Sequence, residues 1–380
     1  MVLLETGFDD PGGLAPRLDV APWRSAWPDE ADWHQLSEAA SEPNPFFESW
    51  LLGPALEAFD PAGRVLLAAL RIDGQLAGIV PLRFSSTYYG HPLPHLTVWL
   101  HPNAFCGVPL IARGFEAMFW SALLDWVDDH ASAAAFLHLP IMPEDSAPDT
   151  ALTEISRDGA RAAGVVARSE RALLASPLSP GEYYEEALPN KKRKELRRQA
   201  RRLGELGTLT VERAETPQAA SRFADDFLAL EAASWKGRAG SSLADDAACE
   251  RFFRLGLVGA AERGRFEGLS LTLDTRPIAM LASFLTPPGA FSFKTTFDED
   301  YARYSPGVLL QKENLDLLQR DGIAWCDSCA APDHPMIDHF WRGQRSVVSR
   351  NVAIGGRLRR TIGTRLIAHE SRKIERTMSA

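Results

Sequence analysis

Residues 291–310 constrain the fold more tightly than any other part of the chain. The first seven are rich in aromatic side chains and predict a strand, and a short loop then leads to Ser305-Pro306-Gly307. Serine is a favoured N-cap and proline suits the first helical position, so this tripeptide predicts the start of a helix. Free N–H groups and the positive dipole end of such a helix bind phosphate groups. In an α/β chain, the segment therefore predicts a phosphate-bearing cofactor.

Length and composition narrow the class of protein. A chain of 380 residues exceeds one ordinary core, so we expect two domains of roughly 150–200 residues each. An apolar content of 45% with 24% charged residues is typical of a globular protein that is soluble. A net charge of −9 disfavours a dedicated nucleic-acid binder. Four cysteines give no disulfide framework and favour a reducing cytoplasm.

Neither a leader nor a spanning segment is predicted. Met1 is followed by three apolar residues and then at once by the acidic Glu5, Asp9 and Asp10, which is unlike a signal peptide. No window reaches 18 uninterrupted apolar residues, the length typical of a transmembrane helix. We therefore expect a cytoplasmic protein, with peripheral attachment to the inner face of the membrane as an option.

The order of predicted elements indicates two α/β domains, at 1–175 and 176–356, with a basic tail at 357–380. In the first domain, strands at 64–72 and 75–84 flank Asp73-Gly74, a strong hairpin signal. In the second, helices at 190–206, 217–234 and 245–263 accompany strands at 208–213, 266–274, 277–285 and 290–297. Residues 70–77 resemble residues 271–279, so a duplicated α/β unit is the best single account of the chain.

A family resemblance rests on three motifs in the second half. These are Phe227-Leu-Ala-Leu-Glu231 with Ser234-Trp-Lys-Gly-Arg238, then Phe293-Lys294-Thr295, then the run from Tyr301 to Gly307. Together they resemble the GNAT-superfamily acyltransferases. They are most similar to the two-domain branch called cellulose-biosynthesis-associated acetyltransferases, whose fold is similar to that of Fem-type peptidoglycan aminoacyltransferases. The resemblance implies two GNAT-like domains, each a twisted mixed β-sheet flanked by helices, with acyl-CoA as donor and an amine as acceptor.

The same resemblance implies where the donor binds. The strand at 291–297 would diverge from its neighbour and receive the thioester in the gap. The following helix start, formed by Ser305, Gly307, Val308 and Leu309, would receive the pyrophosphate. The chain departs from the family at one point, because the usual Gln/Arg-x-x-Gly-x-Gly/Ala phosphate loop is absent. Fem-type relatives use aminoacyl-tRNA, so that donor stays an alternative.

Four residues are candidates for catalysis. Lys294 is a charge inside an aromatic strand, placed to hold a substrate anion or simply to occupy a polar strand face. Asp327, Cys329 and His334 follow a predicted strand end, where α/β sites usually form. His334 is a possible base or acid oriented by Asp327, and Cys329 a possible nucleophile. The alternative is a polar turn with a packed cysteine and a surface histidine.

Other side chains are candidates for substrate binding. Trp235, Lys236 and Arg238 end a helix as an aromatic plate with two cations, and Tyr301 lies on the loop before Ser305. The alternative role for the cations is compensation of the helix dipole. A single Cys326-x-x-Cys329 pair is a weak zinc signal, so no metal is predicted.

Two basic segments raise the question of a polyanionic partner. Residues 191–202 hold eight Lys and Arg with only Glu195 opposed, and residues 357–380 hold seven against two Glu. The simplest interpretation is a solvated helix face. The others are an anionic membrane surface and a polyanionic donor, either CoA or tRNA.

These observations predict an N-acyltransferase that moves an acyl group from acyl-CoA to a primary amine. The acceptor would be an amino sugar, a peptide or a sphingoid-type lipid amine, which includes a ceramide-synthase-like role. Two alternatives stay open, a Fem-like transferase that uses aminoacyl-tRNA on a cell-wall precursor and a non-catalytic module that binds a polysaccharide or lipid.

Overall fold

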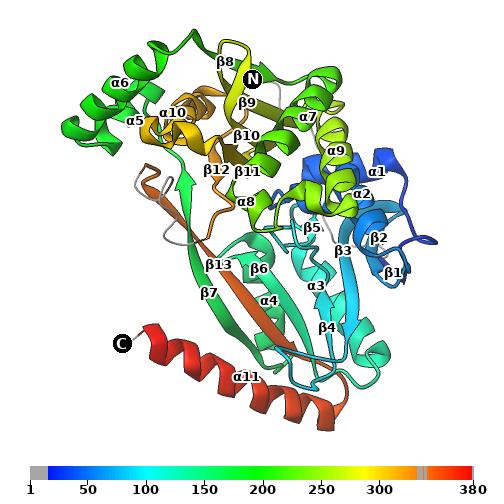
Figure 1. The fold of residues 1–380 in the computed structure, drawn as a ribbon. Coiled ribbons are helices and arrows are strands. Elements are labelled where there is room, and N and C mark those ends of the chain that lie inside the picture. Colours follow the sequence, from blue (N-terminus) through cyan, green and yellow to red (C-terminus); the bar gives the residue numbers. More distant parts are fainter. Residues whose placement is uncertain (1–15, 332–336, 338–339, 379–380) are drawn as a thin grey trace, which may run out of the picture. The chain divides into compact units, whose positions relative to one another are not determined.

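The computed structural model describes residues 16–331, 337 and 340–378. They pack as two compact units, which we call unit 1 and unit 2. Unit 1 holds residues 16–52, 60–169 and 346–378, and unit 2 holds residues 53–59 together with the described part of 170–345. The C-terminal segment thus packs with the first half of the chain. Figure 1 labels the elements.

Unit 1 is a mixed sheet with helices. Its strand order is β1-β2-β3-β4-β6-β13, in which β4 and β6 are parallel and the other four neighbouring pairs are antiparallel. The predicted hairpin is confirmed, with Asp73 and Gly74 in the left-handed region at φ 50° and 86°. The strands are β1 (Pro16–Pro22), β2 (Leu66–Ile72), β3 (Gln75–Ser85), β4 (His95–Val98), β5 (Leu110–Ile111), β6 (Phe136–Pro143), the first part of β7 (Ala163–Leu174) and most of β13 (Gly343–Ala353). The helices are α1 (Glu30–Ala39), the first part of α2 (Ser49–Phe59), α3 (Glu116–His130), α4 (Ala147–Asp158) and α11 (Arg357–Met378).

Unit 2 repeats this plan. Its sheet runs β7-β12-β11-β10-β9-β8, with β11 and β12 parallel and the other pairs antiparallel. The strands are the end of β7, β8 (Leu209–Ala214), β9 (Phe266–Leu273), β10 (Arg276–Thr286), β11 (Gly289–Phe297) and β12 (Trp325–Asp327). The helices are α5 (Pro180–Ala187), α6 (Asn190–Gly204), α7 (Pro217–Ala233), α8 (Trp235–Arg238), α9 (Ala247–Ala261) and α10 (Pro306–Glu313), with 3-10 turns at Leu243–Asp245, Glu299–Tyr304 and Asn314–Gln319.

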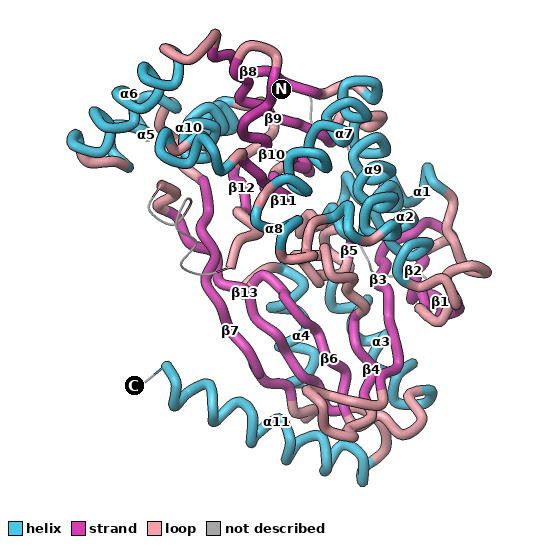
Figure 2. Tube along the Cα trace, in the orientation of Figure 1, coloured by secondary structure: helices cyan, strands magenta, loops and turns pink. Residues whose placement is uncertain are grey.

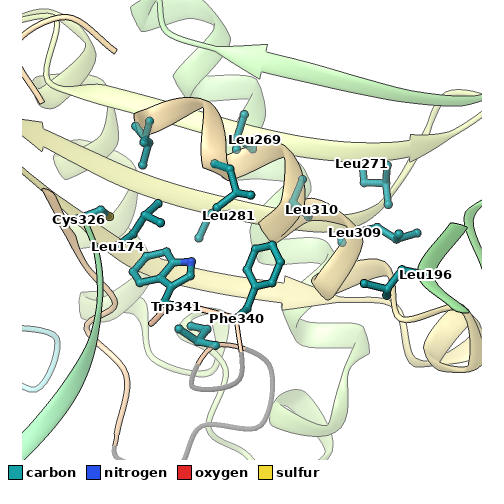
Figure 3. Packing of buried hydrophobic residues seen from close by; sticks show 14 of the residues in the cluster. Leu174, Leu196, Leu269, Leu271, Leu281, Leu309, Leu310, Cys326, Phe340 and Trp341 are labelled. Atoms are coloured by element: carbon teal, nitrogen blue, oxygen red, sulfur yellow. The ribbon is translucent and has the colours of Figure 1, made fainter. Parts of the chain in front are cut away.

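The sheet of unit 2 buries both faces, and side chains alternate between them along each strand. Leu269 and Leu271 of β9 face α10, in a cluster that also holds Leu309. Figure 3 shows this cluster, including Phe340 and Trp341. On β9, Phe266 has the opposite parity and contacts Phe223 of α7 at 5.5 Å between ring centroids. Helices therefore cover both faces of this sheet (Figure 2).

Most predicted elements of the second half are present within a few residues of the expected bounds. The helix predicted at 190–206 is α6, and the strand predicted at 290–297 is β11. Several elements were not predicted, among them β1, α4, α5 and the twelve-residue strand β7. The basic segment expected as a tail from residue 357 is the helix α11 as far as Met378. Half of the short helix predicted near residues 336–341 lies outside the described residues.

Within the described ranges, no helix combines the length and the apolar character needed to cross a membrane.

Candidate active site

The parallel strands β11 and β12 pair over only three residues. The pairs run from Gly289 with Trp325 to Phe291 with Asp327, and β11 then continues for six residues to Phe297. On its other side, β11 stays paired with β10 as far as Phe297 opposite Ala279. After Asp327 the chain therefore leaves β11, and residues 292–297 of β11 continue without a β12 partner along that edge. This edge is where the predicted divergence of strands places a thioester.

A β-bulge lies at the same place on β11. Ser292 is opposite Ser283 and Lys294 is opposite Ala282, so Phe293 is an additional residue on the β11 side of the pair. A bulge bends its strand and redirects the adjacent side chains, which is common beside active sites. The bulge therefore coincides with the point at which β12 stops pairing.

Lys294 follows this bulge directly. Its side chain is half-buried, and its Nζ lies 5.6 Å from the centroid of the Phe293 ring. Burial lowers the pKa of the Lys294 ammonium, and the positive charge of Lys236 lowers it further. Glu231, Cys249 and Cys329 act in the opposite direction but more weakly. A lysine with a lowered pKa becomes a proton acceptor closer to neutral pH.

Glu231 and Lys236 form a buried ion pair beside β11. The Glu231 side chain is 2% exposed, and its Oε1 lies 2.7 Å from Lys236 Nζ. Glu231 Oε2 accepts the backbone N–H of Leu243 at 2.8 Å, and Lys236 Nζ also donates to the carbonyl of Thr295 at 3.3 Å. The pair thus connects α7 and α8 to the strand residue next to Lys294. The Lys236 ammonium therefore has two partners within the protein, Glu231 Oε1 and the Thr295 carbonyl.

Gly237 explains how α8 comes this close to α7. A Cβ at this position would lie 1.8 Å from the carbonyl oxygen of Ala232, which is backbone and unable to move aside. Gly237 therefore lies inside α8 at a position where only glycine fits.

Asp327 ends β12 and orders the turn that follows. Its Oδ1 accepts the backbone N–H of Cys329 at 2.8 Å, and its Oδ2 lies 3.7 Å from Arg171 and 4.0 Å from Arg345. Cys329 is 8% exposed and has a φ of 52°, which is uncommon for a residue with a side chain. Cys329 is near enough to Lys294 to act on its pKa, so these two predicted catalytic residues lie in the same part of unit 2.

The start of α10 differs from the predicted cap. Pro306 is the first helical residue as expected, but Ser305 has a left-handed backbone with φ 53°, and its side chain makes no cap hydrogen bond. The Ser305 carbonyl instead accepts the N–H groups of both Val308 and Leu309 at 3.0 Å. Those two donors are therefore used within the helix, and Leu309 packs into the core (Figure 3).

The other predicted site residues are dispersed. Trp235 is 53% exposed on α8, Arg238 pairs with Glu299, and Tyr301 packs partly buried against the core. His334 lies outside the described residues. In the part of the chain that the structure describes, no cluster of three His, Cys, Asp or Glu side chains could hold a metal ion.

Two features of the site were not predicted. Glu231 was quoted within a family motif but not as a site residue, although one acid among Phe227-Leu-Ala-Leu is the kind of signal that marks a buried pair. The bulge at Phe293 depends on pairing with β10, and the sequence of β11 alone contains no sign of it.

Comparison with known proteins supports the resemblance. Residues 190–334 match the family model described as "Acetyltransferase (GNAT) domain". The crystal structure of FemX aligns with a TM-score of 0.57 at 10% identity, over 87% of this chain and 96% of that one. A conserved protein of unknown function from Bacteroides thetaiotaomicron VPI-5482 aligns with a TM-score of 0.55 at 11% identity, over 89% and 99%. At these identities the two structures share the fold. A search of curated proteins found no match.

Proposed function

We propose that the protein transfers an acyl group from acyl-CoA to a primary amine, and the match of residues 190–334 to the model of a GNAT acetyltransferase domain supports this reaction class. One observation carries the proposal. β12 stops pairing with β11 after three residues, next to a β-bulge in β11, and Lys294 follows this bulge directly. It leaves a strand edge for the thioester, and a half-buried lysine with a lowered pKa beside it.

The proposed chemistry assigns roles to the residues of this chain. The neutral acceptor amine attacks the thioester carbonyl carbon, and Lys294 Nζ takes the proton that the attacking nitrogen loses. Backbone N–H groups along β11 stabilise the tetrahedral oxyanion, a contribution of about 3–4 kcal/mol for each donor in other enzymes. The C–S bond breaks, the amide forms, and the Lys294 ammonium returns the proton to the leaving thiolate.

The donor and acceptor are narrower proposals. We favour CoA as donor because α10 follows β11 through the 3-10 turn Glu299–Tyr304, and its Gly307 lies in the first helical turn. We propose an amine of an amino sugar, a peptide or a sphingoid-type lipid as acceptor. The basic residues of 191–202 on α6 and of α11 support attachment to an anionic membrane, where each cation contributes about 1 kcal/mol.

The test is thiol release by the full-length protein. Acetyl-CoA or a long-chain acyl-CoA is mixed with glucosamine, a short peptide or sphinganine, and free CoA is followed with a thiol reagent while mass spectrometry identifies the amide. We expect acceptor-dependent release of free thiol with at least one pair. A protein that releases no thiol with any pair, but consumes aminoacyl-tRNA in a parallel assay, would establish the Fem-like alternative. Inactivity in both assays would leave the non-catalytic module.

A further inference from the structure

Unit 1 contains an open cleft of about 570 Å³ at the end of strands β3, β4 and β6. We propose that this cleft is a binding site for a phosphate monoester, separate from the acyltransferase chemistry of unit 2. Its walls include Arg64, Arg83, Ser85, Ser86, Thr97 and His138. A volume of this size is typical of sites for small organic ligands.

The register of the sheet explains why the polar side chains converge. Arg83 on β3 is paired with Thr97 on β4, and Thr97 is paired with His138 on β6. Directly paired residues project from the same face of a sheet with Cβ atoms about 5 Å apart. Arg83, Thr97 and His138 therefore form one row across three strands, and that row lines the cleft.

The cleft is positively charged without compensation. Arg64 and Arg83 line it, and none of its described lining residues is Asp or Glu. In the described ranges, neither guanidinium takes part in a hydrogen bond or ion pair. Elsewhere in unit 1, Arg161 and Arg350 are paired with Asp128 and Asp149. Two unmatched arginines facing one cleft indicate an anionic ligand, since guanidinium groups bind phosphate and carboxylate with two parallel hydrogen bonds.

A buried network holds His138 in place behind the cleft. His138 Nδ1 lies 2.7 Å from Asn351 Oδ1, and Asn351 Nδ2 donates to Glu370 Oε2 at 2.9 Å and to Tyr88 Oη at 3.0 Å. These contacts orient the amide oxygen of Asn351 toward His138, so His138 Nδ1 is the protonated nitrogen. Burial lowers the pKa of His138 to about 4, with the Asn351 hydrogen bond acting against this and the nearby His95 adding to it.

His138 is therefore neutral at physiological pH and adds no charge to the site. The charge available is that of two arginines, which matches a phosphate monoester dianion better than a single carboxylate. The hydroxyl groups of Ser85, Ser86 and Thr97 supply further donors. The ring of Phe84, which is 44% exposed and also lines the cleft, provides an apolar surface for the organic part of the ligand.

Calorimetric titration of the full-length protein with phenyl phosphate tests the proposal. We expect saturable binding that weakens about tenfold or more in R64Q and in R83Q, the usual loss for one charged hydrogen-bonding partner. Arg113→Gln is the matched control, because Arg113 is exposed in the same unit but does not line the cleft. Phenyl phosphate should bind more tightly than benzoate, and R113Q should bind like the wild type.

Several outcomes would overturn the site. These are no binding of phenyl phosphate by the wild type, equal binding by the R64Q/R83Q double variant, or an equal loss in R113Q, which would indicate an effect of net charge alone.

Vesicles of phosphatidylcholine with phosphatidic acid provide a second experiment. Sedimentation with these vesicles that is lost in R64Q/R83Q would assign the site to a lipid-borne phosphate monoester. The binding assays do not require acyl transfer, so their outcome is independent of whether the proposed activity is correct.

Discussion

Lys294→Met is expected to lower kcat/KM for acyl transfer by about 10²–10⁴, the range for removal of a general base. Methionine keeps most of the apolar part of the side chain but has no Nζ, so the proton acceptor is lost together with its contact with the Phe293 ring. Thiol release under saturating acyl-CoA measures the effect. Lys312→Met, on the last turn of α10, is the matched control and should have wild-type turnover.

The pH dependence of kcat/KM distinguishes a general base from a side chain that contributes only a positive charge. Because the base acts unprotonated, kcat/KM should rise with pH through the pKa of Lys294, which burial and Lys236 lower from 10.5. Acceptor amines of different basicity identify the rise that is caused by Lys294. This rise stays at the same pH for every acceptor, whereas the rise caused by deprotonation of the acceptor shifts with the pKa of that acceptor. Lys294→Arg keeps the charge but has no usable base and should be as inactive as Lys294→Met. Wild-type turnover in either variant would remove Lys294 from the mechanism.

Lys236→Met is expected to lower the free energy of unfolding by about 3–5 kcal/mol, because it leaves the Glu231 carboxylate buried without its cation. Glu231 is 2% exposed, so little solvent reaches the charge that remains. The variant also loses the hydrogen bond from Lys236 to the Thr295 carbonyl, next to the proposed base Lys294. Urea unfolding followed by circular dichroism measures the change.

The double variant E231Q/K236M is the control for this prediction. Glutamine still accepts the N–H of Leu243 but carries no charge, so the double variant should be clearly more stable than K236M alone. If K236M loses less than about 1 kcal/mol, the usual range for exposed pairs, then the ion pair is not buried in solution. Equal stability of the single and double variants would contradict the assigned cause.

Local sequence patterns predicted much of unit 2, because its core elements are amphipathic or continuously apolar. β11 and α6 were expected close to their observed bounds, and Pro306 begins a helix as its fixed φ favours. In contrast, β7 was missed, since its residues 163–169 are mostly half-exposed and show no sustained apolar run. Such a strand is specified by its neighbours in the sheet rather than by its own composition.

The site was predictable only in part, because it is built from tertiary pairing. Lys294 was identified as a charge inside an aromatic strand, but its position after a bulge comes from the register with β10. Ser305 was expected to cap α10 through its side chain, and its left-handed backbone in the structure does not follow from its identity. Glu231 became visible only once its partner on α8 was located.

Backbone hydrogen exchange of the full-length protein, with and without acetyl-CoA, tests most directly whether the donor binds at the edge where β11 and β12 part. We expect slower exchange in peptides that cover residues 289–297 and 305–310, with the strands of unit 1 unchanged. Protection confined to unit 1, or binding of acetyl-CoA with no change in those two segments, would contradict this expectation.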